Sequence, residues 1–252
     1  MALFQPTNIT PSDLNGTGTI DASEDMAVTW QVNGTGNTPM VAFKIDIMLN
    51  DTASTLLYST GQVPLSEPFY GTDSLGNPEY FTATITAEAL DAAGIVNDAE
   101  KVYKFLITQW WSAAESVLQS SASAFIARAK PVVSIENFEQ TVASLRYTFE
   151  GAYSQAQGDP IEWARWQISS GAGNEILLDT GRVYNMGRLE TTYDGFLSGN
   201  NYMVRLSGQT INAVEFDTGW QIFTAEYEQA TLDGGAHACP RCDTDAVQVY
   251  FP

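Results

Sequence analysis

Three residues with clear chemical potential lie close together near the C-terminus: His237, Cys239 and Cys242. An imidazole and two thiolates at this spacing resemble one half of a zinc knuckle. A closed structural zinc site usually takes four ligands, and the chain has no second cysteine pair, so zinc would need Asp243 or a ligand from another subunit. The alternatives are a reduced or a locally bridged cysteine pair. We predict no metal and no cofactor, with these three residues as the candidate ligands if a metal binds.

The single histidine also limits the catalytic arrangements that the chain could form. A Ser/His/Asp or Cys/His arrangement would have to use His237 as its base, and this residue follows the last predicted strand. The sequence contains no nucleophile elbow and no Gly-rich phosphate loop with its lysine. Two of the many carboxylates could form a glycosidase pair, but no pattern distinguishes them. We therefore predict that the protein is not an enzyme.

The charge of the chain is strongly one-sided, because 30 Asp and Glu residues against 11 Lys and Arg residues give a net charge of −19 at pH 7. Nucleic acids and anionic membranes both attract basic surfaces, so we expect neither as a partner. The first residues lack the basic start and apolar run of a secretory signal, and no stretch of about 18 apolar residues predicts a transmembrane segment. The acidity favours solubility of a protein displayed at high local density.

Alternating side chains predict β-strands over most of the chain. From Met26 to Val32 every second residue is apolar, which is the pattern of a strand with one buried face. The stretch from Val41 to Leu49 repeats this pattern, and the turn-forming residues 33–39 between the two stretches predict a hairpin. Further strands are predicted over residues 56–63, 80–86, 103–111 and 121–127.

The chain contains two similar segments, LLYSTGQV at Leu56–Val63 and ILLDTGRV at Ile176–Val183. Each contains a Thr-Gly pair, which begins at Thr60 in the first segment and at Thr180 in the second, 120 residues later. Because this separation is the length of a whole domain, we interpret the segments as the same middle strand, with its Thr-Gly bend, in two copies of one sandwich. Lys130-Pro131 should form a short, stiff joint between the copies. The predicted segments are a β-sandwich over 1–129, a second over 130–229 and a C-terminal arm over 230–252.

The alternation also predicts which side chains form the two cores. In each sandwich, the apolar residues on one face of every strand should point into the space between the two sheets. The stretch from Thr86 to Val96, rich in Ala and Glu, is the one segment of helical composition, and we interpret it as a connection with one short turn. The predicted core residues are Trp30, Phe43, Ile45 and Phe105 in the first sandwich and Tyr147, Trp166, Val204 and Leu206 in the second.

Two stretches resemble the fibronectin type III family. In FLSGNNYMVRL, which ends at Leu206, a hydrophobic residue and a glycine precede a tyrosine that opens a strand of alternating Val and Leu. The stretch AVTW, which ends at Trp30, resembles the early tryptophan strand of that family. The pattern departs at Tyr147, where tryptophan would be expected, and lacks a clear glycine before Tyr103. The resemblance extends to Gln229 and implies an all-β fold of two tandem antiparallel sandwiches, followed by an extended arm.

A second resemblance concerns QWWSAAESVLQSSASAFIARAKP, which ends at Pro131, together with the opening FQPTNITPS. These stretches are similar to minor virion structural proteins of tailed phages and prophages of Gram-positive bacteria. The similarity implies a non-enzymatic virion protein of the tail, baseplate or capsid surface, assembled in the host cytoplasm, with other virion proteins and copies of itself as partners. The alternative is an adhesin in which Tyr70, Tyr80 and Tyr193 stack on glycans of a host surface. Fold alone does not separate these functions.

Two further parts of the sequence are predicted to make contacts. Adjacent strand residues point to opposite faces, so a strand that buries its other apolar residues should point Trp111 inward and Trp110 outward. Exposed tryptophans often dominate interfaces, so Trp110 is a predicted contact residue unless a bulge or the neighbouring domain covers it. In the arm, Val247, Val249 and Phe251 share one strand face, which suits pairing with a sheet edge of this chain or a neighbouring one.

Overall fold

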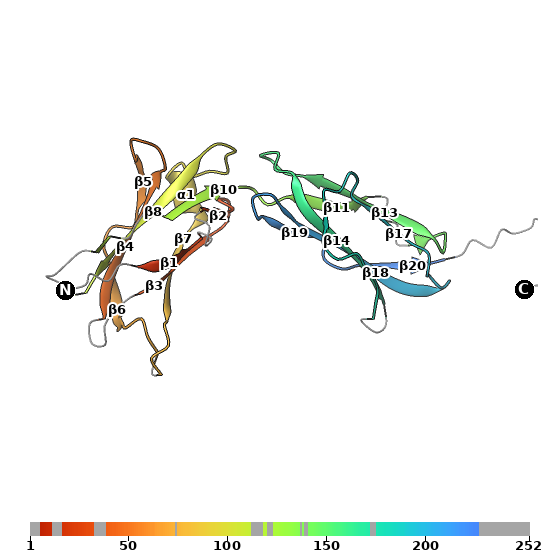
Figure 1. Cartoon of the computed structure of the whole chain (residues 1–252), viewed down its shortest axis with the longest axis horizontal. Coiled ribbons are helices and arrows are strands. Elements are labelled where there is room, and N and C mark those ends of the chain that lie inside the picture. The colour runs from red at the N-terminus through yellow and green to blue at the C-terminus, as the bar shows by residue number, and fades with distance from the viewer. Residues whose placement is uncertain are drawn as a thin grey trace, which may run out of the picture.

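The computed structural model of the chain shows two β-sandwiches arranged end to end along the longest axis of the molecule (Figure 1). Within the described residues, each sandwich contains one three-stranded and one seven-stranded sheet. This confirms the predicted all-β fold of two tandem, mainly antiparallel sandwiches. The structure describes residues 6–11, 17–32, 39–73, 75–111, 118–119, 123–136, 138, 141–171 and 175–226.

The first sandwich has a fixed strand order in each of its sheets. The three-stranded sheet has the order β1 (Thr7–Thr10), β3 (Met26–Gln31), β7 (Tyr80–Ile85). The larger sheet has the order β2 (Thr17–Ile20), β10 (Ser123–Ala127), β8 (Val102–Trp110), β4 (Met40–Leu49), β5 (Leu56–Ser59); β6 (Val63–Phe69) also pairs with β4, and β9 (Leu118–Gln119) with β8. Only β2 and β10 run parallel among these described pairs.

A short helix, α1 (Ala87–Ala92), follows β7 in the segment that the sequence predicts to be a connection with one short turn. The side chain of Thr86 caps the helix by accepting a hydrogen bond from the backbone N–H of Ala89, 3.3 Å away. Leu90 is fully buried, so the helix also contributes to the first core. In the part of the chain that the structure describes, no helix has the length and apolar character needed to cross a membrane.

The second sandwich repeats the topology of the first. Its three-stranded sheet has the order β11 (Val132–Glu136), β13 (Tyr147–Ser154), β17 (Glu190–Tyr193). Its larger sheet has the order β12 (Thr141–Val142), β20 (Gln221–Ala225), β18 (Asn200–Thr210), β14 (Ile161–Ser170), β15 (Ile176–Asp179); β16 (Val183–Tyr184) also pairs with β14, and β19 (Glu215–Asp217) with β18. The parallel pair β12 and β20 corresponds to β2 and β10.

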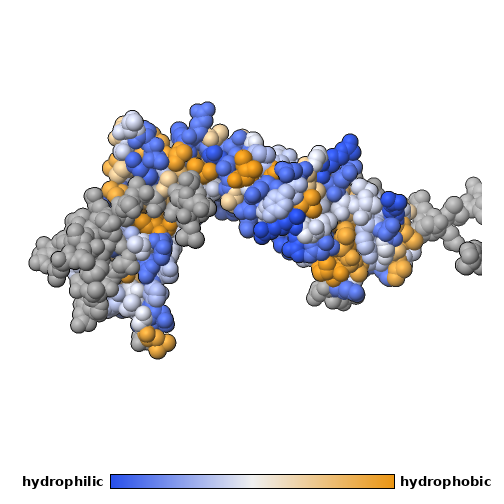
Figure 2. Space-filling model, in the orientation of Figure 1, coloured by the Kyte–Doolittle hydropathy of each residue, from blue (hydrophilic) through white to orange (hydrophobic). Residues whose placement is uncertain are grey.

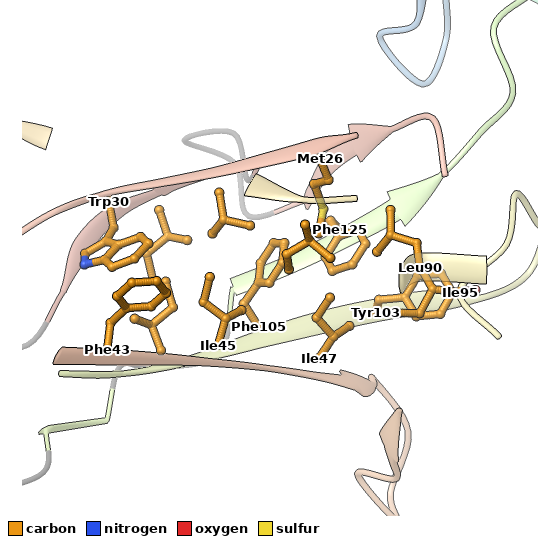
Figure 3. Close-up of a cluster of buried hydrophobic side chains, with 14 of the residues drawn as sticks. Met26, Trp30, Phe43, Ile45, Ile47, Leu90, Ile95, Tyr103, Phe105 and Phe125 are labelled. Carbon is orange, nitrogen blue, oxygen red and sulfur yellow. The ribbon is translucent and has the colours of Figure 1, made fainter. Parts of the chain in front are cut away.

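The first core lies between the two sheets, where Figure 3 shows aromatic and aliphatic side chains from both sides meeting. The indole ring of Trp30 packs against Phe43 and Phe81, with ring centroids 5.6 and 5.0 Å away. All four predicted core residues are buried: Trp30, Phe43, Ile45 and Phe105. Burial of such side chains is the main favourable contribution to folding of this sandwich.

The second core contains three of its four predicted residues, Trp166, Val204 and Leu206, whereas Tyr147 is only half-buried.

The strand register shows which residue of the second sandwich corresponds to Trp30 of the first. A pair of threonine hydroxyls lies on the outside of each three-stranded sheet, 2.9 Å apart in the first sandwich and 2.7 Å apart in the second. The residue after the first threonine is Trp30 in one case and Phe149 in the other, and both are fully buried in the core. Placing the tryptophan position at Tyr147 was therefore wrong, because alternation selects a face but not a register.

The two Thr-Gly pairs lie at equivalent places in the two sandwiches, as predicted, but each forms a corner between two short strands rather than a bend within one strand. The N–H of Thr180 donates to the carbonyl of Trp166 (3.1 Å), and its Oγ1 accepts from the Trp166 N–H (3.0 Å). Thr60 makes the same pair of bonds with Ile45, at 3.0 and 2.9 Å. Gly181 has a φ of 63°, which glycine adopts without strain. Each corner bonds to the long strand between the end of one short strand and the start of the next, β5 and β6 in the first sandwich and β15 and β16 in the second.

A third corner of the same design occurs at Thr218, between β19 and β20. Its N–H donates to the carbonyl of Leu206 (2.9 Å), and its Oγ1 accepts from the Leu206 N–H (3.0 Å). In both corners of the second sandwich an aspartate precedes the threonine, and its carboxylate accepts a hydrogen bond from the glycine N–H. The corners therefore keep the backbone groups of buried strands satisfied where strand pairing is interrupted.

Replacement of Thr180 by valine tests the role of these corners. Valine has nearly the same shape but cannot accept the hydrogen bond from the buried Trp166 N–H, so we expect a loss of about 1–3 kcal/mol in the free energy of unfolding of the second sandwich. Urea denaturation followed by tryptophan fluorescence measures this loss. The matched control is Thr192→Val, because the Thr192 side chain lies on an exposed sheet face. Equal effects of the two substitutions would contradict the prediction.

Candidate interaction surfaces

The structure places the two adjacent tryptophans on opposite faces of β8, as alternation predicts. Trp110 ends the strand, pairs with Ala42 of β4 and is half-buried on the outer face. Trp111 is 8% exposed and belongs to the first core. Trp110 is thus partly accessible on the outer face of β8. Its role as a contact residue stays a prediction.

Two sets of predicted site residues lie outside the described part of the chain. These are the arm residues Val247, Val249 and Phe251 and the candidate metal ligands His237, Cys239 and Cys242. Among the residues that the structure does describe, no group of three or more His, Cys, Asp and Glu side chains could hold a metal ion.

The three tyrosines predicted to stack on glycans differ in accessibility. Tyr70 and Tyr80 are 53% and 50% exposed and flank the small hairpin closed by the Thr72–Pro78 bridge, in the connection from β6 to β7. Tyr193 instead packs at the margin of the second core, where its ring lies edge-on to Phe196 with centroids 4.8 Å apart. Burial raises the pKa of its hydroxyl. Only the first two tyrosines are therefore available for stacking on a ligand.

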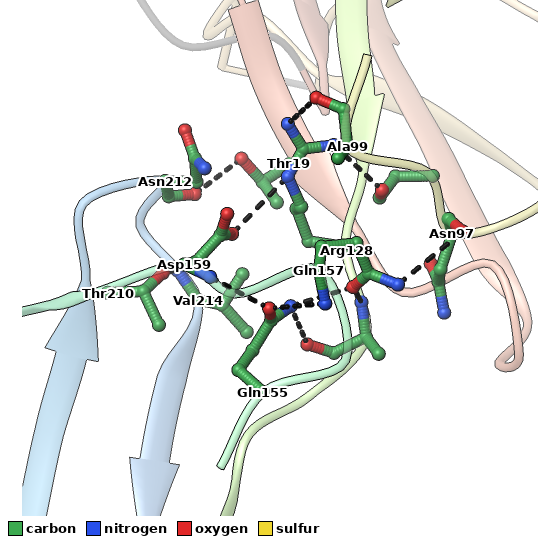
Figure 4. A network of polar contacts seen from close by, with 12 residues as sticks. Thr19, Asn97, Ala99, Arg128, Gln155, Gln157, Asp159, Thr210, Asn212 and Val214 are labelled. Carbon is green, nitrogen blue, oxygen red and sulfur yellow. Dashed lines mark hydrogen bonds and ion pairs between the residues drawn. The ribbon is translucent and has the colours of Figure 1, made fainter. Parts of the chain in front are cut away.

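A polar cluster joins the two sandwiches, and Arg128 lies at its centre (Figure 4). Its side chain is 8% exposed, and Nε lies 3.3 Å from a carboxylate oxygen of Asp159, whose side chain is 9% exposed. The guanidinium also donates to the carbonyls of Asp98 and Ala99, in the first sandwich. Because Asp159 belongs to the second sandwich, this buried ion pair crosses the joint. The terminal nitrogens of the guanidinium are thus satisfied by carbonyls, whereas Nε and the Asp159 oxygen make the ion pair without a hydrogen bond among the described residues.

Two glutamines complete this cluster, which we call the joint clasp. Gln157 accepts a hydrogen bond from the Ala129 N–H (2.9 Å), and Gln155 donates to the Ala129 carbonyl (3.0 Å). Beside them, the hydroxyl of Thr19 donates to the carbonyl of Asn212, 2.6 Å away. The two glutamines thus bind the residue before Lys130-Pro131 to the second sandwich, and the Thr19 bond crosses the joint. The clasp therefore fixes the orientation of one sandwich on the other.

The larger sheet of the second sandwich carries a group of arginine and aromatic side chains on its outer face. Figure 2 shows apolar side chains among hydrophilic ones on the visible surface of this sandwich. Ile222 is 62% and Trp220 38% exposed, although both are large and apolar. Three of the 11 Lys and Arg residues of this acidic chain lie here. We define the arginine face as Trp163, Arg165, Arg182, Arg205, Trp220 and Ile222.

Two of these arginines are held by the corner aspartates. Nε of Arg165 donates to Asp179 (2.8 Å), and Nε of Arg205 donates to Asp217 (2.9 Å). The hydrogen bonds from Arg165 lower the pKa of Asp179 to about 2, and those from Arg205 lower the pKa of Asp217. Both carboxylates are thus ionised at neutral pH and orient the two planar guanidiniums outward as a fixed pair.

Trp163 connects this pair to the third arginine. The guanidinium carbon of Arg182 lies 4.4 Å from the centroid of the Trp163 ring, and the indole N–H donates to Gln209 (2.9 Å). A shallow hollow of about 270 Å³ opens between Trp163, Arg205 and Asp217. Tryptophan and arginine are the residues most enriched at the energetic centres of protein interfaces. The arginine face is therefore the best candidate interaction surface among the described residues.

Sequence reasoning missed both the joint clasp and the arginine face. Their members come from several loops and strands that are far apart in the sequence, so no local motif marks them. The sequence offered one signal. Basic residues are rare in this chain, and alternation on β14 and β18 predicts that two of them, Arg165 and Arg205, point outward.

The comparisons with known proteins find similarity among solved structures alone. No protein-family model matches the chain, and no curated protein matches it. Among solved structures, the FN1-FN3 domains of chicken CNTN1 align with 88% of this chain and 66% of that chain, at 11% sequence identity and a TM-score of 0.39. The chain thus spans slightly less than two thirds of the length of that structure. The strand order and register described above establish the fold independently of this similarity.

Proposed function

We propose that the protein is a non-enzymatic interaction protein that acts through assembly contacts, with its two sandwiches held as one rigid unit. The observation that carries this proposal is the arginine face, which exposes tryptophan, isoleucine and three arginines on a chain of net charge −19. The joint clasp supports it, because a rigid unit loses less conformational entropy when it is built into an assembly.

Within this function, we propose that the assembly is a virion and that the chain is a component of the tail, the baseplate or the capsid surface. The resemblance of the stretch ending at Pro131 to minor virion proteins of tailed phages supports this assignment. The acidic surface is consistent with a protein present at high local density. The expected partners are other virion proteins and further copies of this chain.

A second candidate function is glycan binding by an adhesin, and one observation favours it. Tyr70 and Tyr80 are about half exposed and flank the same hairpin of the first sandwich. Aromatic rings at such a place could stack on the apolar faces of sugars. Tyr193 does not contribute, because its ring packs against the second core.

The virion assignment is tested on particles purified by density gradient from the bacterium that carries this sequence. We expect mass spectrometry to find the chain in the particle fraction, and we expect Trp110→Ala to reduce its incorporation while leaving its Tm nearly unchanged.

A glycan array separates the two candidate functions. The isolated chain should bind no member of the array. The adhesin function predicts the opposite: specific glycan binding that Tyr70→Ala and Tyr80→Ala abolish, and no chain in the particles.

A further inference from the structure

The three-stranded sheet of the first sandwich ends in an open edge at β7. This strand pairs with β3 on one side, and no described strand pairs with it on the other. In an antiparallel pair, alternate residues direct their N–H and C=O groups away from the partner strand, so about three of the residues in β7 direct theirs outward. β7 therefore presents unpaired backbone groups to which a further strand could bond.

β7 lacks the protections that usually prevent such strand addition. Its six residues, YFTATI, include no charged residue and no proline, and its pairing with β3 contains no bulge. The neighbouring edge strand β6 contains Pro64 and Pro68, which have no N–H to donate. The corresponding edge strand of the second sandwich, β17, has four residues and begins with Glu190. On a chain of net charge −19, β7 is thus an edge that a second copy can approach without meeting like charges on the strand.

The space between the two sheets is also incompletely closed along this edge. Four apolar side chains pack against the first core here and are only partly buried: Leu65, Phe69, Phe81 and Ala83. The rings of Phe69 and Phe81 are in contact, with centroids 5.3 Å apart. We call these four residues the open seam. A further strand with apolar residues on its inner face would remove them from water.

The sequence contains a segment with the pattern that the open seam requires. Residues 246–252, AVQVYFP, carry no charge, and Val247, Val249 and Phe251 alternate with Gln248 and Tyr250. Pairing of this arm segment with β7 would satisfy the outward backbone groups of the strand, and its three alternate apolar side chains would lie on the open seam. The arm segment and the edge thus match in charge, in alternation and in backbone bonding.

The position of β20 indicates which copy the arm segment reaches. Ala225 at the end of β20 pairs with Asn200 at the start of β18, whereas Asn212, beyond the other end of β18, bonds to Thr19 at the joint. β20 therefore ends on the side away from the first sandwich (Figure 1), about 33 Å from the joint at the rise of a β-strand. A linker of 20 residues, the length of residues 227–246, has a root-mean-square span of roughly 25 Å. The seam of a neighbouring copy is thus the more accessible one at high density.

Resting on the assembly function proposed above, we infer that residues 247–251 of one copy add a strand to β7 of a second copy. Each copy donates one strand and accepts one, so the contact is heterologous and extends head to tail, into a ring if the rotation closes and into a filament if it does not. The contact depends on backbone hydrogen bonds and apolar burial, so added salt should not weaken it.

Sedimentation velocity on the purified full-length chain tests this inference. We expect concentration-dependent self-association that persists in about 0.5 M NaCl, where exposed ion pairs are screened. V247E/V249E should raise the dissociation constant about tenfold or more, because it places charges against the open seam. The matched control is Q248E/Y250E, which adds the same charge to the other face of the arm segment and should associate nearly as the wild type does.

A variant of the acceptor edge allows a rescue experiment. Ala83→Glu places a charge at the open seam, where inward-pointing charges prevent strand addition, and it should weaken self-association about as much as V247E/V249E. An equimolar mixture of the two variants should form a complex of two copies and no larger species. In that complex the intact arm segment of the Ala83→Glu chain meets the intact seam of the other chain, which an effect on folding or on overall charge would not produce.

Hydrogen exchange measured by mass spectrometry localises the contact and keeps the test decisive if Ala83→Glu fails to fold. Amides of residues 80–85 should gain protection as the wild type associates, whereas those of residues 190–193, in the corresponding strand of the second sandwich, should not. A wild-type chain that stays monomeric, or one in which residues 80–85 are equally protected in the monomer, would overturn the inference. So would a mixture that forms no two-copy complex from folded variants. The proposed function is judged separately, by the presence of the chain in purified particles.

Discussion

Replacing Arg128 by alanine is expected to lower the free energy of unfolding by about 3–5 kcal/mol and to loosen the joint between the sandwiches. The substitution leaves the buried carboxylate of Asp159 without its cation and removes the donors for the carbonyls of Asp98 and Ala99. An uncompensated buried charge costs far more than the loss of an exposed ion pair. Differential scanning calorimetry measures the stability, and small-angle X-ray scattering measures the distribution of overall dimensions, which should broaden.

The matched control is Lys130→Ala, since Lys130 also makes an ion pair near the joint, with Glu24. Both side chains of that pair are more than half exposed, and such pairs contribute about 0–1 kcal/mol. We therefore expect Lys130→Ala to leave both measurements close to those of the wild type. A variant at Arg128 that matched this control would show that the clasp does not hold the sandwiches together.

The second large effect is expected for Trp30→Ala, which removes the largest fully buried side chain of the first core. The ring contacts with Phe43 and Phe81 are lost and a cavity remains, so the first sandwich should lose about 3–5 kcal/mol. For a domain of this size, that loss lowers Tm by roughly 10–20 °C or more. Calorimetry should show this shift in one transition, while the transition of the second sandwich changes little.

Trp30→Phe is the control that the second sandwich itself suggests, because Phe149 occupies the corresponding position there. The indole nitrogen of Trp30 has no hydrogen-bond partner among the described residues, so phenylalanine costs no such bond. We expect less than half of the destabilisation caused by alanine. Equal destabilisation by both variants would mean that the indole shape, rather than the filled volume, supports this core.

Much of the fold could be predicted from the sequence because strands carry a local signal. Alternation identifies β3, β4 and β14, and it predicts that Trp30, Ile45 and Trp166 are buried. The same signal could not place Phe149 opposite Thr191, because register depends on the partner strand. It also could not reveal that a threonine hydroxyl replaces a missing strand partner at the corners.

The candidate surfaces could not be predicted in the same way, because they exist only after strands are paired. Arg165 and Arg205 are far apart in the sequence, and only the antiparallel register of β14 and β18 brings them to the same part of one sheet face. The joint clasp likewise combines Arg128 with a loop of the second sandwich. By contrast, the outward direction of Trp110 needed only local alternation, and there the sequence was sufficient.

The threonine corners have a consequence for how this protein behaves when it is crowded. A long straight outer strand would expose a row of backbone N–H and C=O groups, which is the usual template for amyloid-like growth. Here the corners end β5 and β15 after four residues, and the same edge continues only in the separate strands β6 and β16, so the outer edge of each larger sheet is interrupted. Backbone pairing between copies at these edges is thereby disfavoured, and copies packed at high density are left to meet through other surfaces.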